Sequence, residues 1–231
     1  MAESRRIIFT SDGSPTIWDP LFKESFHSRF GAIQESEWIF IGAGLNYLLR
    51  SGREEVKILE IGMGSGLNVL LTIKALKSLN VSLLYDAVEL FPLDEELYSS
   101  LDFDLVSLSG IFKLIHESRW GEWVTLEKDR KLRKLNADAS RYEFPNNTYN
   151  LIYYDAFSPE SQPEMWSPEM FKKIAESMEP GAIFVTYSSK GEVRRRLQES
   201  GLKVERLPGP EGKRHIIRAV KPTDDSQFTP Q

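Results

Sequence analysis

Short apolar runs alternate with amphipathic helical segments along most of this chain, and this alternation restricts the fold more than any other feature. Five runs have the composition of buried strands, at residues 57–62, 83–89, 132–138, 149–157 and 181–188. Helical patterns lie around and between them, at 67–79, 92–101, 167–178 and 192–201. Strands connected through helices form a mostly parallel sheet with helices on both faces. The sequence therefore predicts an α/β domain of the Rossmann-like class.

The last two predicted strands, 202–207 and 215–220, differ from the others. The segment PGPEGK (208–213) joins them and leaves no room for a crossover helix, so they are antiparallel. A seven-stranded sheet with an antiparallel last strand resembles the fold of class I methyltransferases that use S-adenosylmethionine. It differs from the fully parallel dinucleotide-binding arrangement.

Two segments stand outside the alternation. Residues 6–19 (RIIFTSDGSPTIWD) carry an Asp-Gly turn signal and predict a hairpin. We expect residues 1–50 to form an N-terminal extension on a core domain of residues 51–221, followed by a flexible tail at 222–231. An insertion at about 101–127 is rich in aromatic residues. We expect both the extension and the insertion to cover the site.

A glycine-rich loop, Glu60-Ile61-Gly62-Met63-Gly64-Ser65-Gly66, follows the first core strand. Glycines let the backbone approach a ligand closely, and the next helix begins with unpaired N–H groups. A nicotinamide fingerprint would need glycine at position 67, which is leucine, and the G-K-[ST] phosphate loop is absent. The pattern resembles motif I of class I methyltransferases, and this predicts cofactor contacts at Glu60, Gly62, Gly64 and Gly66. The alternative is a turn without a ligand.

Two acids at strand ends extend this prediction. Glu89 ends the second strand, 23 residues after Gly66, where a carboxylate can accept hydrogen bonds from both ribose hydroxyls. Asp138 ends the third strand, where similar folds bind the adenine amino group. The alternative for Asp138 is a helix cap or a loop acid.

Asp155 ends the fourth, almost wholly apolar strand and begins the segment DAFSP. The carboxyl ends of strands near the crossover form the ligand crevice of an open sheet. A carboxylate next to buried apolar residues needs a cation or a hydrogen-bond donor as partner. A primary amine substrate or the ammonium group of the cofactor would supply one. The alternative is a helix cap.

At this point the chain resembles a known family, the methyltransferase domain of the MnmC enzymes that modify the wobble uridine of tRNA. The resemblance covers nearly the whole chain, and its motifs are Asp12-Gly13-Ser14, FHSRFGAIQESEWIFI (26–41), EIGMGSGLN (60–68), His116-Glu117-Ser118 before Trp120-Gly121, DAFSP (155–159), Pro163-x-Met165-Trp166, Gly191-x-Val193-Arg194-Arg195-x-Leu197 and Gly212-Lys213-Arg214.

The resemblance implies transfer of a methyl group from S-adenosylmethionine to 5-aminomethyl-(2-thio)uridine, with Asp155 as the catalytic residue. It also implies cofactor contacts at Gln34 and Asn68. Phe157, Pro159 and Trp166 are implied on the substrate side, where the two aromatic residues would stack on the everted base, with core packing as the alternative. The bifunctional members carry a flavin oxidase domain that makes the amine, and we expect no FAD domain here. The segment PGPEGKRHI departs from the family pattern and puts the detail of that loop in doubt.

The chain contains no cysteine, which excludes thiolate metal sites, iron–sulfur clusters and catalysis through a cysteine adduct. We expect no metal. The net charge of −5 argues mildly against a nucleic-acid partner, but residues 186–221 carry ten basic and four acidic side chains. We predict that Lys190, Arg194, Arg195, Lys213 and Arg214 contact phosphates near the tRNA anticodon loop. The alternative is a solvated helix face.

No stretch is long and apolar enough for a membrane span, and the N-terminus has no secretory pattern, so we expect a cytoplasmic protein. Two alternatives remain beside the tRNA methyltransferase. One is a class I methyltransferase for a small metabolite or a protein, which the isoelectric point of 5.4 favours slightly. The other is a non-catalytic module that binds cofactor or tRNA. The joint presence of the glycine loop, Glu89 and Asp155 argues against that module.

Overall fold

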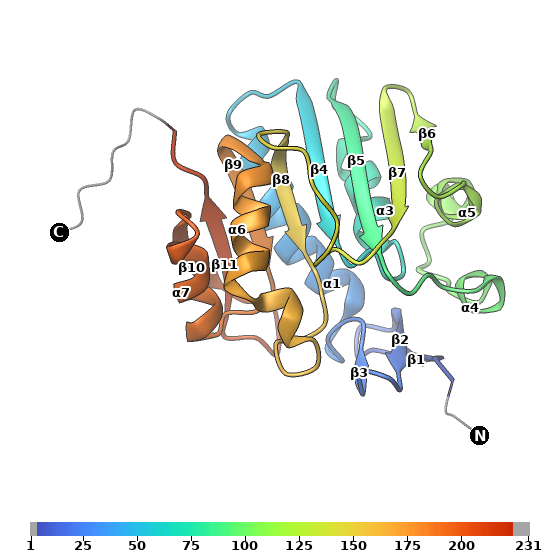
Figure 1. The fold of residues 1–231 in the computed structure, drawn as a ribbon. Helices are drawn as coiled ribbons and strands as arrows, with labels where there is room; N and C mark the ends of the chain where they lie inside the picture. The colour runs from blue at the N-terminus through green and yellow to red at the C-terminus, as the bar shows by residue number, and fades with distance from the viewer. Residues whose placement is uncertain (1–3, 224–231) are drawn as a thin grey trace.

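A computed structural model describes residues 4–223, which form an eight-stranded sheet, a separate three-stranded sheet and helices on both faces of the larger one (Figure 1). The strand order in the larger sheet is β10-β11-β9-β8-β4-β5-β7-β6. Its five central strands are all parallel, and they are β4 (Glu55–Ile61), β5 (Ser82–Glu89), β7 (Arg130–Asn136), β8 (Tyr149–Tyr154) and β9 (Met178–Thr186). The order reverses at β4, so the β4 and β8 ends flank the ligand crevice.

The last two strands have the predicted arrangement. Strand β11 (His215–Val220) lies between β9 and β10 (Lys203–Pro208) and is antiparallel to both. The joining loop has no room for a helix, so β10 can return only as one strand of a hairpin.

An eighth strand, β6 (Trp123–Glu127), adds to the seven that the sequence predicts. It pairs antiparallel with β7 at the edge of the sheet and comes from the predicted insertion. The insertion also forms η2 (Val106–Leu108) and α5 (Ser109–Glu117). Strand β6 is short and half exposed, so its residues carry no run of apolar side chains that sequence inspection would detect.

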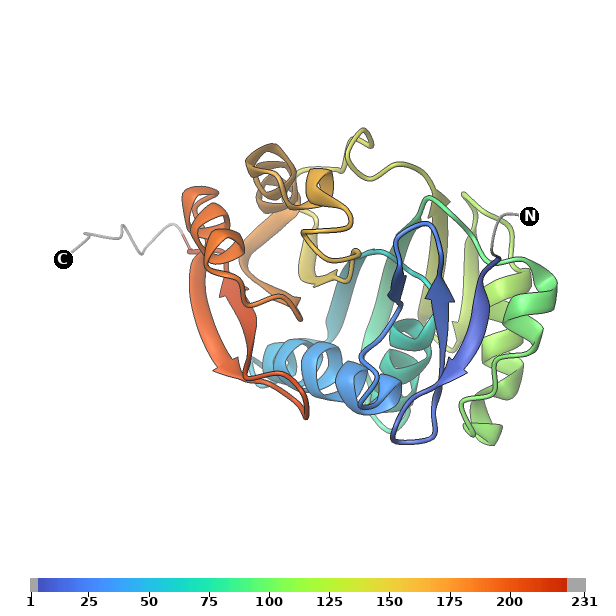
Figure 2. The same cartoon turned by 90° about the horizontal axis from the view of Figure 1, so that it is seen from below.

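Different helices cover the two faces of the sheet (Figure 2). One face is covered by α3 (Leu67–Leu76) and by a continuous helix made of α1 (Ala32–Ser36), the π-helical η1 (Glu37–Asn46) and α2 (Tyr47–Leu49). The other face is covered by α6 (Pro168–Ser177) and α7 (Gly191–Glu199). Two shorter helices, α4 (Glu95–Ser99) and η3 (Pro163–Trp166), complete the described chain. Ser167 caps α6 as predicted, accepting a hydrogen bond from the Met170 N–H at 3.2 Å.

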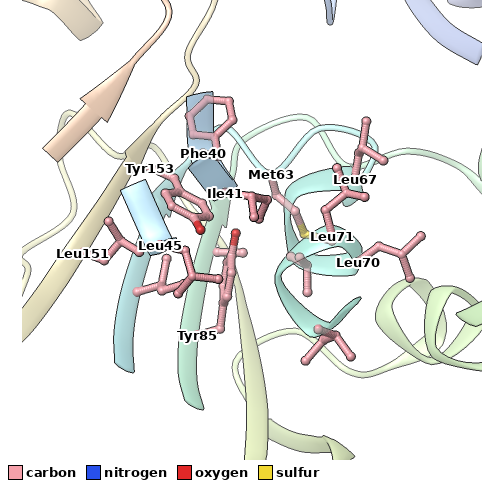
Figure 3. Packing of buried hydrophobic residues seen from close by; sticks show 14 of the residues in the cluster. Phe40, Ile41, Leu45, Met63, Leu67, Leu70, Leu71, Tyr85, Leu151 and Tyr153 are labelled. Atoms are coloured by element: carbon pink, nitrogen blue, oxygen red, sulfur yellow. The ribbon is translucent and has the colours of Figure 1, made fainter. Parts of the chain in front are cut away.

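Aromatic and aliphatic side chains under α3 anchor the glycine loop. Tyr85 on β5 and Tyr153 on β8 are fully buried, and their ring centres lie 6.1 Å apart (Figure 3). Met63 and Leu67, from the loop and the start of α3, are buried in the same cluster. Burial of a large side chain contributes about 1.5–3 kcal/mol. The burial of Met63 and Leu67 in this cluster therefore stabilises the position of the glycine loop.

The three-stranded sheet lies beneath the carboxyl ends of the central strands (Figure 1). It consists of β1 (Arg6–Phe9), β2 (Pro15–Asp19) and β3 (Glu24–Ser25), and β1 and β2 form the predicted hairpin around Asp12 and Gly13. Arg5 holds it in place by donating to the Asp19 carboxylate at 2.7 Å and to the Phe91 carbonyl at 2.8 Å. The carboxyl edge of the main sheet is thereby covered.

The division at residue 50 stays a prediction, and most of the predicted tail at 222–231 lies outside the described residues. Within residues 4–223, no helix is long and apolar enough to cross a membrane. The same described part contains no cluster of three or more metal-ligating side chains.

Candidate active site

A cavity of about 300 Å³ lies between the carboxyl edge of the main sheet and the three-stranded sheet. Its walls come from the glycine loop and the ends of β5, β7 and β8. Residues 22, 24–28 and 35 of the N-terminal extension, together with Tyr187 and Lys213, complete the lining. The volume is at the lower end of the range for ligand pockets. Segments far apart in the sequence thus form one enclosed site.

The glycine loop needs its glycines for two separate reasons. Gly62, Gly64 and Gly66 have φ angles of 86°, 54° and 73°, a region that L side chains rarely adopt. A Cβ on Gly62 would also lie 2.6 Å from the Asp155 carbonyl oxygen. The loop backbone can therefore line the cavity and touch the β8 end only with glycine at position 62.

The two strand-end acids on the same side both line the cavity. Glu89 accepts hydrogen bonds from the Gly64 N–H at 2.9 Å and the Phe91 N–H at 2.8 Å. Asp138 is engaged in a local turn, accepting from the Ser140 N–H at 2.9 Å. Both carboxylates keep lone pairs for further donors, since each oxygen can accept two bonds.

Asp155 lines the cavity and belongs to a network of buried polar groups. The Asn68 amide donates to the Asp155 Oδ2 at 3.0 Å and to the fully buried Glu60 at 2.9 Å. Burial and the nearby Glu35 carboxylate raise the pKa of Asp155 to about 8, although Asn68 and Lys213 act in the opposite direction. Asp155 is therefore poised to change protonation near neutral pH.

The wall facing the glycine loop contains an ion pair between a buried carboxylate and a half-buried lysine. Glu35 in α1 is only 7% exposed, and Lys213 from the β10–β11 loop lies 3.1 Å from its carboxylate. The Lys213 ammonium also lies 4.9 Å from the Tyr187 ring centre. Tyr187 in turn donates to the Ala156 carbonyl at 2.9 Å. The β10–β11 loop thus reaches the cavity beside Asp155.

The loop that follows Asp155 is held by the N-terminal extension. Glu24 in β3 accepts hydrogen bonds from the hydroxyls of Ser158 and Ser161. Phe157 stacks on Phe22 with ring centres 4.1 Å apart. Because these contacts link residues more than 130 positions apart, the loop conformation depends on docking of the extension.

This side-chain set fits S-adenosylmethionine. The positive-φ glycines form a backbone cradle, Glu89 offers two oxygens at the cavity wall, and Asp155 offers a carboxylate. Two buried polar atoms near the loop, the Ser65 hydroxyl and the side-chain amide oxygen (Oδ1) of Asn68, have no hydrogen-bond partner within the described protein. Buried polar groups are normally paired, which indicates a polar ligand at this position.

The structure brings together most of the residues predicted for the cofactor, namely Gly62, Gly64, Asn68, Glu89 and Asp138, around Asp155. Glu60 and Gly66 lie directly behind them, at the start and the end of the loop. Gln34 is exposed and does not line the cavity, whereas its neighbour Glu35 does. The cofactor role of each residue stays a prediction.

The predicted substrate residues fall into separate places. Phe157 lines the cavity, but Trp166 is fully buried and donates its indole N–H to the Phe157 carbonyl at 2.7 Å. Trp166 has the surroundings of the core-packing alternative. Pro159 is half-buried and lies outside the cavity lining.

The predicted phosphate contacts are likewise dispersed. Lys213 is inside the cavity with Glu35, and Lys190 is paired with Glu160 at the surface. Arg194 is half-buried, and Arg195 and Arg214 are exposed. Their contacts with tRNA stay predictions.

The insertion at 101–127 does not cover the cavity, contrary to expectation, because none of its residues lines the cavity. It supports the glycine loop from behind. The His116 imidazole lies 3.1 Å from the Ser65 carbonyl oxygen and stacks on Tyr98. Burial lowers the pKa of His116 to about 4, so this imidazole is neutral at pH 7.

Comparison with known proteins finds similarity to methyltransferases. Residues 122–222 match a family described as S-adenosyl-L-methionine-dependent methyltransferase. The bifunctional protein MnmC for tRNA 5-methylaminomethyl-2-thiouridine biosynthesis is 29% identical in Aromatoleum aromaticum, over 92% of this chain and 35% of the relative. The Campylobacter hominis protein of the same name is 31% identical, over 86% of this chain and 30% of the relative.

Among solved structures, MNMC2 from Aquifex aeolicus superposes with a TM-score of 0.79 at 27% identity, covering 96% of this chain and 74% of that one. The chain is similar to the methyltransferase part of MnmC. It spans about a third of the length of the curated MnmC relatives. A spermidine synthase from Thermotoga maritima, at 15% identity and a TM-score of 0.59, shares the fold alone. The predicted class I methyltransferase fold and the resemblance to MnmC are confirmed.

Several residues around the cavity were missed by inspection of the sequence. Glu24, Glu35 and Tyr187 carry no motif on their own, and their partners Ser158, Lys213 and the Ala156 carbonyl are distant in sequence. Glu35 lies within the stretch that carries the resemblance, which was the one available signal.

Proposed function

We propose that this protein is an S-adenosylmethionine-dependent N-methyltransferase that converts 5-aminomethyl-(2-thio)uridine to 5-methylaminomethyl-(2-thio)uridine at the tRNA wobble position. The observation that carries the proposal is Asp155, a carboxylate in the cavity directly beside the glycine loop, with its pKa raised to about 8. The similarity to MnmC supports the choice of substrate.

The cofactor, when bound, supplies an electrophilic methyl group. The loop at Gly62–Gly66 and Glu89 would hold it, and the covered cavity would limit access of water. That methyl group would pass to the nitrogen of the substrate, and sulfur would retain the electron pair of the broken carbon–sulfur bond.

The amine must first lose a proton, because a protonated amine has no lone pair. Asp155 has the position and the basicity to accept that proton, since a base is most effective when its pKa lies near the working pH. Asn68 holds one oxygen of Asp155, which leaves the other free to face the amine. The chain therefore contributes orientation and proton acceptance at one carboxylate.

Phe157 supplies an aromatic face for the uracil ring, stacked on Phe22 at the cavity wall. Bases in single-stranded RNA are commonly read by stacking on aromatic side chains. The anticodon loop presents such an unpaired base, which is consistent with a cavity too small for a duplex.

Nucleoside mass spectrometry of tRNA from cells that lack this protein tests the proposal. We expect 5-methylaminomethyl-(2-thio)uridine to disappear and its aminomethyl precursor to accumulate, with restoration by the wild-type gene. An unchanged nucleoside profile would contradict the proposal and favour a small-metabolite or protein substrate.

A further inference from the structure

The three-stranded sheet has one buried and one open face. Ile7 and Ile17 face each other in register and pack into the core. The neighbouring pair, Arg6 and Trp18, points to the opposite face, where the Arg6 guanidinium lies 5.8 Å from the centre of the Trp18 ring. A guanidinium at this distance from an indole forms a cation–π contact.

A second hollow begins at Arg6 and Trp18 and extends around the end of β1 to Phe9. Its lining includes Arg6, Phe9, Trp18 and Arg29. Both arginines are exposed, and Phe9 is 75% exposed. No carboxylate lines the hollow, and neither guanidinium has an acidic partner within residues 4–223. Lys190 and Lys213, by contrast, are each paired with a glutamate. Arg6 and Arg29 therefore place positive charge without an acidic partner on the N-terminal extension, next to the half-buried indole ring of Trp18.

The hollow and the cavity share a wall. Trp18 lines the hollow, and its register partner Ser25 lines the cavity. Ser28 lines the cavity, and the next residue, Arg29, lines the hollow. A chain with one unit in the cavity would place an adjacent unit over the hollow, because the two sites are lined by neighbouring residues, Ser28 with Arg29 and Ser25 with its strand partner Trp18.

We propose that this hollow, lined by Arg6, Phe9, Trp18 and Arg29 and here called the nucleotide platform, binds a nucleotide next to the target base in single-stranded RNA. The inference rests on the proposed function. Base rings would stack on Trp18 or Phe9, and phosphates would contact the two guanidinium groups. Single-stranded RNA carries planar rings and phosphates along one chain, and the platform offers aromatic rings and guanidinium groups within one hollow.

Fluorescence anisotropy with a labelled RNA hairpin that carries an anticodon-type loop tests the platform, with a perfect duplex of equal length for comparison. The variants are Arg6→Gln with Arg29→Gln, and separately Trp18→Leu. The matched control is Lys128→Gln with Lys131→Gln. It removes the same charge from two exposed residues at and just before the start of β7 in the eight-stranded sheet, at the end away from the three-stranded sheet. Calorimetric titration with S-adenosylmethionine, expected to be unchanged, shows whether each variant is folded.

We expect the double arginine variant to bind the hairpin about tenfold more weakly and to lower the slope of log affinity against log salt by about two. Trp18→Leu should weaken hairpin binding about tenfold but leave duplex binding unchanged. The lysine control should stay within about twofold of wild type, because its charges lie far from the site.

Hairpin affinity within twofold of wild type in both platform variants would overturn the proposal. So would an equal loss in the lysine control, or an equal effect of Trp18→Leu on the duplex. If only the proposed function is wrong, the hairpin would still bind through the platform, but nucleoside mass spectrometry would find no nucleoside methylated by this protein. If wild type binds no RNA, both proposals fail.

Discussion

The two walls of the cavity differ in how their residues are connected. The glycine-loop wall is assembled from one strand–loop–helix unit, with Gly62 to Asn68 close in sequence and Glu89 on the adjacent strand. The opposite wall is assembled from distant segments, joining Glu35 to Lys213 and Glu24 to Ser158. The first wall depends on local geometry, whereas the second depends on correct docking of the N-terminal extension. We therefore expect the two walls to respond to mutation independently.

Asp155, at the boundary between the walls, gives the largest expected effect. Asp155→Asn keeps the shape of the side chain but removes the proton acceptor, and we expect turnover to fall by about 10²- to 10⁴-fold. Affinity for S-adenosylmethionine should stay within about twofold, since the glycine loop is untouched. Single-turnover kinetics and calorimetric titration measure the two quantities. A parallel loss of both would place Asp155 with the cofactor wall.

Gly62→Ala breaks the glycine-loop wall alone. Its φ of 86° and the 2.6 Å approach to the Asp155 carbonyl leave no room for a Cβ. We expect cofactor affinity to fall about 100-fold, because the loop must shift to relieve the strain. Gly13→Ala is the matched control, since Gly13 has a φ of 81° but open space around it. Equal cofactor affinities of the two variants in calorimetric titration would contradict this account of the loop.

Two buried histidines allow the stability of the walls to be compared by pH. Burial lowers the pKa of His27, in the extension, and of His116, behind the glycine loop, to about 4. For each histidine the pKa in the folded protein lies below the unfolded value near 6.5. Its contribution to the free energy of unfolding is therefore fully present above pH 6.5 and is lost as the pH falls toward 4. The loss is about 3 kcal/mol per histidine.

Urea unfolding between pH 7 and pH 4 tests this prediction with His27→Asn and His116→Asn. Each variant should lose about 3 kcal/mol less of its unfolding free energy on acidification than wild type does. The two effects should add, because the histidines share no partner. Variants with the wild-type pH dependence would show that the histidines titrate normally in the fold.

The ion pair Glu35–Lys213 gives the smallest expected effect. The Glu35 charge raises the pKa of Asp155 and the Lys213 charge lowers it. In the pH profile of kcat/KM, where activity rises as Asp155 ionises, Glu35→Gln should shift the rising limb to lower pH. Lys213→Met should shift it to higher pH, each by about one pH unit. Shifts in the same direction would remove the pair from the electrostatics of Asp155.

The difference between the walls also explains how much the sequence could predict. The alternation of elements, the glycine loop, Glu89 and Asp155 were predicted from local patterns, because strand ends in a parallel sheet meet at one edge. Strand β6 was missed because only one of its five residues is buried. Trp166 was predicted on the substrate side, with core packing as the alternative. The sequence could not decide between the two, because the burial of Trp166 and its hydrogen bond to the Phe157 carbonyl depend on tertiary packing. Glu35 and Lys213 meet only after the extension docks, so no local pattern reports their contact.

The most direct test of the account is methyl transfer by the purified protein. The protein would be incubated with S-adenosylmethionine carrying a deuterated methyl group, with one tRNA pool that bears 5-aminomethyl-2-thiouridine and a matched pool that lacks it. Nucleoside mass spectrometry would follow the label. We predict a single labelled methyl on the aminomethyl nitrogen and none in the matched pool. Label absent from that nitrogen, or equal label in both pools, would contradict a cavity in which Asp155 directs an amine toward the cofactor wall.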